Sequence, residues 1–274
     1  MTRHFLTLKD LSRSELVALI QRAIALKKDP TGPQTAELMR LQTMVLIFEK
    51  TSTRTRTSFE VACAHLGGSS IFLSPTDSQM SRGESVSDTA RIVSSMADLI
   101  VMRTSEHSRV CTMAEYSSVT VINALSEDFH PCQLLADLQT FVEHRGDIQN
   151  ARTAFIGDGS SNVCQSWINA AAMMDFELRV GAPEGYHPQR SLVETAGNRC
   201  QVTTSAQEAV SDVDLVITDT WTGMGQENEK TQRLDALSDF QVNQQLMALA
   251  SKDALFMHCL PAYRGQEVSA EVLE

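Results

Sequence analysis

The sequence has no long apolar run, no closely spaced pair of cysteines and no excess of basic residues. A membrane-spanning helix needs about 18 consecutive apolar residues, and no run in this chain approaches that length. The residues that follow Met1 lack the apolar core of a signal peptide. The net charge of −11 argues against nucleic acid and anionic membrane surfaces as partners. We therefore expect a cytoplasmic protein that binds neither nucleic acid nor membrane.

The cysteines indicate neither a disulfide framework nor a metal centre. The six are scattered along the chain, at Cys63, Cys111, Cys132, Cys164, Cys200 and Cys259. All except Cys259 are expected to be buried thiols. His258 stands beside Cys259, but neighbouring residues on a strand point to opposite faces. Because no second pair of ligands has a suitable spacing, we expect no metal.

Short apolar runs alternate with longer amphipathic stretches along the chain. Strands are expected at 43–48, 70–73, 99–102, 119–122, 152–156, 177–181, 214–218 and 254–258. Helices are expected at 12–27, 57–66, 85–97, 132–144, 163–174 and 239–250. This alternation predicts an α/β fold with parallel sheets and helices on both faces. The polar, aperiodic stretch 144–151 suggests two domains, residues 1–147 and 148–274, each with a doubly wound parallel sheet.

The most informative segment is Ser52-Thr53-Arg54-Thr55-Arg56, which lies between an expected strand and a helical pattern. Free backbone N–H groups and the positive end of the helix dipole favour an anion at such a position. Arginine adds a planar fork that matches two phosphate oxygens. A helix cap alone would explain one hydroxyl residue, but not two arginines among several hydroxyls. The segment therefore predicts a phosphate site.

Polar groups follow expected strands in both halves of the chain. They are Arg54, Arg103, His130, the turn Gly157-Asp158-Gly159, Asp219 and Cys259. In open α/β sheets, ligands lie outside the carboxyl ends of the strands. These groups therefore predict a small-molecule active site in the cleft between the two domains.

Two of these groups have alternative interpretations. His130 precedes Pro131 at an expected helix start, where its pKa should fall and leave a neutral imidazole that donates one hydrogen bond. A purely structural role at the helix start is equally consistent with the pattern. The turn from Gly157 to Asn162 resembles a dinucleotide-binding turn, but Asn162 replaces the third glycine. NAD binding is therefore not expected, and Asn162 is interpreted as a polar contact for a ligand.

The segments after the last two expected strands also suggest chemistry. The loop that holds Asp219 and Trp221 is rich in glycine, and we interpret it as a lid that closes over a substrate. Cys259 ends the last expected strand, shortly before Pro261. A nucleophilic cysteine would need a histidine within reach, whereas a hydrogen-bonding thiol would not. The spacing alone leaves both roles open.

Together these motifs resemble those of the ornithine carbamoyltransferases, in the aspartate/ornithine carbamoyltransferase family. The resemblance covers nearly the whole chain. The Ser-Thr-Arg-Thr-Arg segment and His130-Pro131-Cys132-Gln133 are typical of carbamoyltransferases in general. The Asp219-Thr220-Trp221 loop and His258-Cys259-Leu260-Pro261 are typical of the ornithine branch.

The resemblance implies that the carbamoyl group passes from carbamoyl phosphate to the side-chain amine of L-ornithine, giving citrulline and phosphate without a cofactor. It also implies a role in arginine biosynthesis and a homotrimer or a multiple of trimers. Carbamoyl phosphate would be bound by Ser52, Thr53, Arg54, Thr55, Gln79, Arg103, His130 and Gln133. Gln79 would reach into the site of a neighbouring subunit. Ornithine would be bound by Asn162, Asp219, Gly223, Met224, Cys259 and Leu260. The catalytic residues would be Arg103, His130, Asp219 and Cys259.

Three features depart from the family pattern. Gly223 stands where a serine is expected, and Ser160-Ser161 lengthens the glycine turn by one residue. The chain stops at Glu274, so the final helix of the family, which supplies a further arginine to carbamoyl phosphate, is expected to be missing. Gly223 leaves open a carbamoyltransferase for another amine, putrescine or an acylated ornithine. The short tail leaves open a catalytically weak homologue that binds carbamoyl phosphate.

Overall fold

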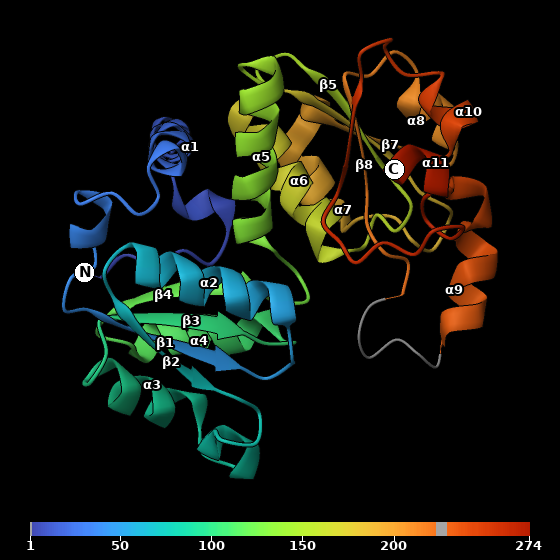
Figure 1. Ribbon diagram of the computed structural model, residues 1–274. Coiled ribbons are helices and arrows are strands. Elements are labelled where there is room, and N and C mark those ends of the chain that lie inside the picture. Colours follow the sequence, from blue (N-terminus) through green and yellow to red (C-terminus); the bar gives the residue numbers. More distant parts are fainter. Residues whose placement is uncertain (1, 223–228) are drawn as a thin grey trace. The chain divides into compact units, whose positions relative to one another are not determined.

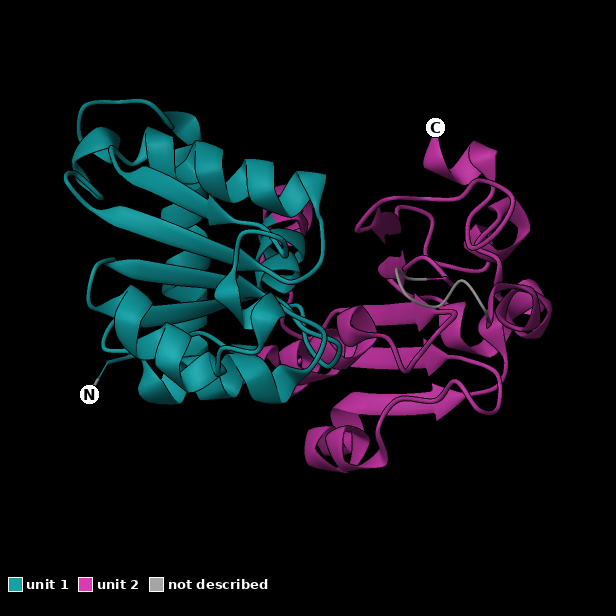
Figure 2. Cartoon of the chain, turned by 90° about the horizontal axis from the view of Figure 1, so that it is seen from below, with its two compact units in different colours: residues 1–139 teal, residues 140–274 magenta. Residues whose placement is uncertain are grey.

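The computed structural model describes residues 2–222 and 229–274. By its internal contacts the chain divides into two compact units, Met1–Gln139 and Thr140–Glu274 (Figure 1, Figure 2). Each unit contains one wholly parallel sheet with helices packed on it, so the predicted α/β fold with two parallel-sheet domains is confirmed. The division falls within helix α5 (Pro131–Arg145). The domain boundary expected between residues 147 and 148 stays a prediction.

The sheet of the first unit has the strand order β2-β1-β3-β4. Its strands are β1 (Thr43–Phe48), β2 (Ser69–Leu73), β3 (Leu99–Arg103) and β4 (Thr120–Leu125). Its helices before α5 are α1 (Arg13–Lys28), α2 (Thr53–His65), α3 (Val86–Ser94) and α4 (His107–Tyr116), with 3-10 turns η1 (Leu8–Asp10), η2 (Thr35–Glu37) and η3 (Gln79–Arg82).

Strand β1 shows why both faces of this sheet are covered. Its side chains alternate between two apolar clusters, as the two-residue period of a strand requires. Val45 and Ile47 pack with residues of α3 and α4, whereas Met44 and Leu46 pack with Cys63 of α2. Both faces are therefore apolar, which accounts for the continuous apolar run in the sequence.

The sheet of the second unit has the strand order β7-β6-β5-β8-β9. Its strands are β5 (Arg152–Ile156), β6 (Glu177–Gly181), β7 (Cys200–Thr203), β8 (Leu215–Thr218) and β9 (Leu255–His258). Its helices after α5 are α6 (Asn162–Met174), α7 (Arg190–Ala196), α8 (Ala206–Val210), α9 (Lys230–Leu237), α10 (Gln244–Met247) and α11 (Ala270–Leu273), with 3-10 turns η4 (Gly197–Arg199) and η6 (Ser238–Phe240).

Two expected helices differ from the structure. Helix α2 begins at Thr53 rather than at 57, so the Ser-Thr-Arg-Thr-Arg segment supplies its cap and first turn. The expected helix at 239–250 is wrong, because η6 and α10 are separate pieces. Between them Val242 donates its backbone N–H to the carbonyl of Glu267, and the side chain of Asn243 caps α10 by accepting from the Leu246 N–H. These tertiary bonds interrupt a segment whose apolar spacing suits a helix.

None of the helices within the described residues is long and apolar enough to cross a membrane.

Candidate active site

The candidate residues of each unit lie at the place where a doubly wound sheet binds ligands. In the first unit β1 and β3 are neighbours, and the chain continues from β1 to one edge of the sheet and from β3 to the other. In the second unit β5 and β8 are related in the same way. Such topological switch points bind ligands beyond the carboxyl ends of the two strands. The Ser52–Thr55 segment follows β1 and Arg103 is the last residue of β3, whereas the Gly157 turn follows β5 and Asp219 follows β8.

Ser52 forms the amino-terminal cap of α2. Its hydroxyl oxygen accepts a hydrogen bond from the Thr55 N–H at 3.3 Å, and its own hydrogen is donated to Thr55 Oγ1 at 2.9 Å. Thr53 and Arg54 occupy the first turn and are exposed. The helix dipole and the hydroxyls therefore meet exposed positive charge at one point, which suits an anion.

Arg103 is the buried cation of this cluster. It is 8% exposed, and its Nη1 donates to Thr55 Oγ1 at 3.1 Å. Its Nε is buried and has no hydrogen-bond partner among the residues that the structure describes. Burial and the positive charge of Arg54 lower the pKa of the Arg103 guanidinium. Two neighbouring cations, one of them buried with an unused donor, would be stabilised by a bound anion.

His130 lies directly before α5 and has an environment that keeps its imidazole neutral. Burial and the nearby charge of Arg103 lower its pKa to about 3. At neutral pH the ring can therefore donate only one hydrogen bond, as the sequence predicts. Gln133 lies on the first turns of α5 and donates its amide hydrogen to Asp137 at 2.8 Å. Gln79 is exposed at the start of η3, and its backbone carbonyl accepts from the Glu84 N–H.

Glu49 is a charged residue of this region that the sequence analysis did not select. Its backbone N–H donates to the carbonyl of Arg103 at 2.9 Å. Its carboxylate accepts from Arg109 Nε at 2.8 Å and from the hydroxyl of Thr104. It therefore fixes the end of β3, where Arg103 lies. Its position directly after a predicted strand is the sequence feature that could have identified Glu49 as a candidate.

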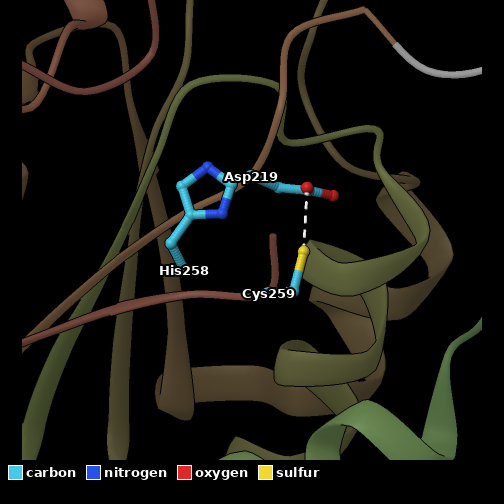
Figure 3. A group of neighbouring side chains, drawn as sticks. All are labelled: Asp219, His258 and Cys259. Atoms are coloured by element: carbon cyan, nitrogen blue, oxygen red, sulfur yellow. Dashed lines mark hydrogen bonds between the residues drawn. The ribbon is translucent and has the colours of Figure 1, made fainter. Parts of the chain in front are cut away.

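Asp219 and Cys259 meet at the ends of the neighbouring strands β8 and β9 (Figure 3). The thiol of Cys259 donates to Asp219 Oδ1 at 3.0 Å, and the Thr220 N–H donates to the same oxygen at 2.7 Å. Burial raises the pKa of the Asp219 carboxyl, although the hydrogen bond from Cys259 opposes this shift. The contact supports the hydrogen-bonding role for Cys259 over the nucleophilic one.

His258 contradicts one expectation of the sequence analysis. One potential ligand atom each from Asp219, His258 and Cys259 lie within 4.8 Å of one another, so His258 and Cys259 do not point to opposite faces (Figure 3). The alternation rule fails because β9 ends at His258. The ring is already engaged: Nδ1 accepts from the Leu260 N–H at 2.9 Å, and Nε2 lies 3.2 Å from Glu267 Oε1. This arrangement leaves no free lone pair on the ring for a metal.

The other predicted ornithine contacts are placed only in part. Asn162 is the first residue of α6, and Ser161 caps that helix by accepting from the Cys164 N–H. The two serines of the longer turn therefore have local roles, since Ser160 also bonds to Asp158. Leu260 is exposed. Gly223 and Met224 lie outside the described residues.

The structure thus brings the predicted residues together in two groups. Ser52, Thr55 and Arg103 are bonded to one another in the first unit, and the charge of Arg54 acts on Arg103. Asp219 and Cys259 are bonded in the second. An open hollow of about 710 Å³ in the second unit contains none of these residues and lies at the amino ends of strands, beside Asp214 and Ala254. That the two groups share one cleft stays a prediction.

Comparison with family models matches both halves of the chain. Residues 3–143 match the carbamoyl-P binding domain of aspartate/ornithine carbamoyltransferase, and residues 149–274 match its Asp/Orn binding domain.

Comparison with individual proteins gives the same family. The chain is 56% identical to an ornithine carbamoyltransferase of Methylococcus capsulatus, over 99% of this chain and 90% of that protein. Among solved structures, it is similar to the anabolic ornithine carbamoyltransferase of Campylobacter jejuni, with a TM-score of 0.92, 44% identity and coverage of 100% and 90%. It is also similar to the ornithine carbamoyltransferase of Pyrococcus furiosus, with a TM-score of 0.93, 38% identity and coverage of 99% and 89%.

Proposed function

The chain belongs to the aspartate/ornithine carbamoyltransferase family, and on that premise we propose that it transfers the carbamoyl group of carbamoyl phosphate to the side-chain amine of L-ornithine, giving citrulline and phosphate. The observation that supports the proposal most directly is the buried Arg103, whose unused Nε and repulsion by Arg54 are explained by a bound anion. The relatives compared above carry ornithine in their names, and nothing in the comparisons favours putrescine or an acylated ornithine.

The phosphate of carbamoyl phosphate is assigned to the start of α2. Backbone N–H groups of the first turn, the hydroxyls of Ser52, Thr53 and Thr55, and the exposed guanidinium of Arg54 would bind its oxygens. Thr55 Oγ1 accepts from both Ser52 and Arg103, so its own hydrogen is left to donate to the ligand. Gln133 would add a contact from α5.

Arg103, His130 and Thr55 are assigned to the carbonyl oxygen of the carbamoyl group. As the amine attacks the carbonyl carbon, negative charge develops on that oxygen, and fixed donors stabilise it. The imidazole of His130 is neutral near pH 7 and would donate one hydrogen bond from its N–H group to this oxygen. When the tetrahedral intermediate collapses, the carbon–oxygen bond to phosphate breaks and phosphate leaves with the electron pair. Phosphate can also accept the proton that the attacking amine releases.

Asp219 and Cys259 are assigned to the amine. A lysine-like amine has a pKa of about 10.4, so its deprotonation near pH 7.5 costs roughly 4 kcal/mol. A buried carboxylate bonded to a thiol can orient the ammonium group and then act as the base that accepts its proton, for which the raised pKa of Asp219 is suited. Asn162, Leu260, Gly223 and Met224 are proposed to bind the amino-acid end. No metal or organic cofactor enters this mechanism.

The test is carbamoyl transfer from carbamoyl phosphate with ornithine, putrescine and N-acetylornithine compared side by side. Citrulline from ornithine, with little product from the other two amines, is expected. Product from another amine in preference to ornithine would move the assignment within the family. Binding of carbamoyl phosphate in calorimetry without any product would contradict the proposed activity and indicate a homologue that only binds its anion.

Four finer assignments are part of the same proposal. The trimer, or a multiple of trimers, with Gln79 completing a neighbouring subunit's site, is supported by the family resemblance. So is the role in arginine biosynthesis. The cytoplasmic location is proposed because the sequence has no long apolar run. The domain boundary is proposed between residues 147 and 148, inside the gap that separates the two family-model matches.

A further inference from the structure

Arg233 of α9 joins the two loops that follow β5 and β8. The residue is 6% exposed. Its Nε donates to the carbonyl of Trp221 at 2.6 Å, and its Nη2 forms an ion pair with the carboxylate of Asp158. Its guanidinium also lies 5.1 Å from the ring centre of Tyr186. One side chain thus bonds to loops that are more than 60 residues apart in the sequence.

Asp158 is itself fixed within the turn after β5. Its Oδ1 accepts from the N–H of Ser160 at 2.9 Å and from the hydroxyl of Ser160 at 2.6 Å. This turn leads directly to Asn162, the first residue of α6. The Arg233–Asp158 pair therefore acts on the backbone that places Asn162.

Trp221 connects the same two loops by packing. Its side chain is 2% exposed and lies against Gly157, where a Cβ atom would be only 2.9 Å from the indole Nε1. Asp219 stands two residues before Trp221. The carbonyl that Arg233 holds is therefore part of the backbone that places Asp219.

Folding stability alone does not explain an arginine at this position. Removing two charges from water is costly, and an apolar pair of similar volume is often as stable as a buried ion pair. A lysine could pair with Asp158, but its single ammonium group lacks the planar fork that aims separate N–H groups at a carbonyl and a carboxylate. The observed geometry uses that fork, because Nε and Nη2 bond to different loops.

We propose that Arg233 is a positioning residue for the amine substrate, which with Asp158 fixes the spacing between Asp219 and Asn162. The inference rests on the proposed function, because it assumes that these two residues bind ornithine. The hydrogen bonds and ion pairs of Arg233 join it to Trp221, Asp158 and Glu229, all residues of the second unit.

The decisive variant is Arg233→Lys in the full-length chain. It keeps a positive charge beside Asp158 but cannot keep both bonds of the fork. We expect kcat/KM for ornithine, at saturating carbamoyl phosphate, to fall about tenfold or more, as the loss of one hydrogen bond from a charged group allows. The Kd of carbamoyl phosphate by calorimetry should stay within about twofold, since its proposed ligands lie in the first unit.

Arg199→Lys is the matched control. Arg199 forms an ion pair with Asp175 in the same unit, at the amino ends of β6 and β7. We expect this variant to keep the ornithine kinetics of the wild type. If Arg233→Lys also keeps them, or if it weakens carbamoyl phosphate as much as ornithine, Arg233 is only a structural residue and the inference is overturned.

A second variant protects the test against loss of folding. Asp158→Asn leaves Arg233 and its bond to Trp221 in place, and its amide oxygen can still accept from Nη2, so it tests the same contact through a change in the other side chain. In a Trp167→Phe background, which leaves Trp221 as the single tryptophan, the fluorescence emission reports the loop, because the Trp221 indole is buried beside Gly157. A changed emission together with a weaker kcat/KM for ornithine supports the inference, and unchanged ornithine kinetics overturn it. Failure of the wild type to form citrulline would instead refute the proposed function.

Discussion

At the scale of single residues, Arg54 and Arg56 show how two neighbouring arginines can have different roles. Arg56 donates to Glu60 at 3.1 Å and lies 3.7 Å from the ring centre of Phe72, so its charge is already used on the helix surface. Arg54 is exposed at the first turn of α2, and its charge reaches the buried Arg103. The sequence alone marks both residues as candidates, and only the contacts separate them.

This difference gives a matched pair of variants. Arg54→Ala should weaken carbamoyl phosphate binding about 10- to 100-fold, because a hydrogen-bonded charge pair with the phosphate contributes about 1.5–3 kcal/mol. Arg56→Ala should leave the affinity within about threefold, since surface ion pairs contribute little. Isothermal titration calorimetry measures both. Equal losses in the two variants would count against the assignment of the phosphate to Arg54.

His130 should make folding stability depend on pH. An unfolded histidine has a pKa of about 6.5, whereas burial and Arg103 lower the folded value to about 3. The unfolded chain therefore binds the proton first as the pH falls. The contribution of the neutral His130 to the free energy of unfolding is therefore fully present above about pH 6.5 and is lost progressively between that pH and about 3.

The measurement compares urea unfolding at pH 7 and pH 5 for the wild type and His130→Asn. The wild type should lose about 1–2 kcal/mol more than the variant over this interval. His65→Asn is a suitable control, because His65 ends α2 and does not belong to this site. An equal loss in wild type and His130→Asn would show that the imidazole is not desolvated in the folded state.

At the scale of elements, the sequence predicts what depends on local pattern and misses what depends on distant contacts. The predicted bounds of β1, β5 and β6 agree with the structure. The apolar run of β1 is typical of a strand buried on both faces, whereas Leu178 and Val180 of β6 alternate with polar residues at the two-residue period of a strand. Strand β7 was not predicted, because the strand has only four residues and some of them are polar. The candidate site residues at the ends of strands could be predicted as well, because each lies directly after a strand that the sequence itself indicates. The Arg233–Asp158 bond could not, because no local pattern relates residues 75 positions apart.

The turn after β5 offers a test at this scale. Gly157 has φ +119°, and a Cβ there would also meet the Trp221 indole at 2.9 Å. Gly185 has φ +86° with open space around it. Gly185→Ala should therefore lower the free energy of unfolding by about 1–2 kcal/mol, which is the cost of a left-handed backbone for a residue with a Cβ. Gly157→Ala should lower the free energy of unfolding by about 1–3 kcal/mol more, because its Cβ would also overlap the Trp221 indole.

Thermal or urea unfolding measures the two glycine variants, and ornithine kinetics show whether the loop moves. Gly157→Ala should raise the KM for ornithine, because relief of the overlap displaces Trp221 and with it Asp219. Similar free energies of unfolding for the two variants would mean that the Trp221 indole can move aside without destabilising the fold. In that case the close approach would have no part in fixing the loop.

At the scale of the whole molecule, the proposed trimer can be tested together with the proposed role of Gln79. Light scattering should give three times the 30.2 kDa chain mass, or a multiple of that. Gln79→Ala and Arg54→Ala should each be weakly active alone. If Gln79 serves a neighbour's site, unfolding and refolding the two together should restore activity, because some sites then combine two intact residues. A monomer, or no recovery on mixing, would contradict this arrangement.

The strand orders have a consequence for how the chain is assembled during synthesis. In the order β2-β1-β3-β4, and again in β7-β6-β5-β8-β9, each new strand is added beside a strand that already exists at an open edge. No later strand has to be inserted between two earlier ones. Both sheets can therefore grow outward from their first strand as the ribosome releases the chain. Cys259 follows β9, the last strand to join this sheet, so the amine site is completed only after the whole sheet has been synthesised.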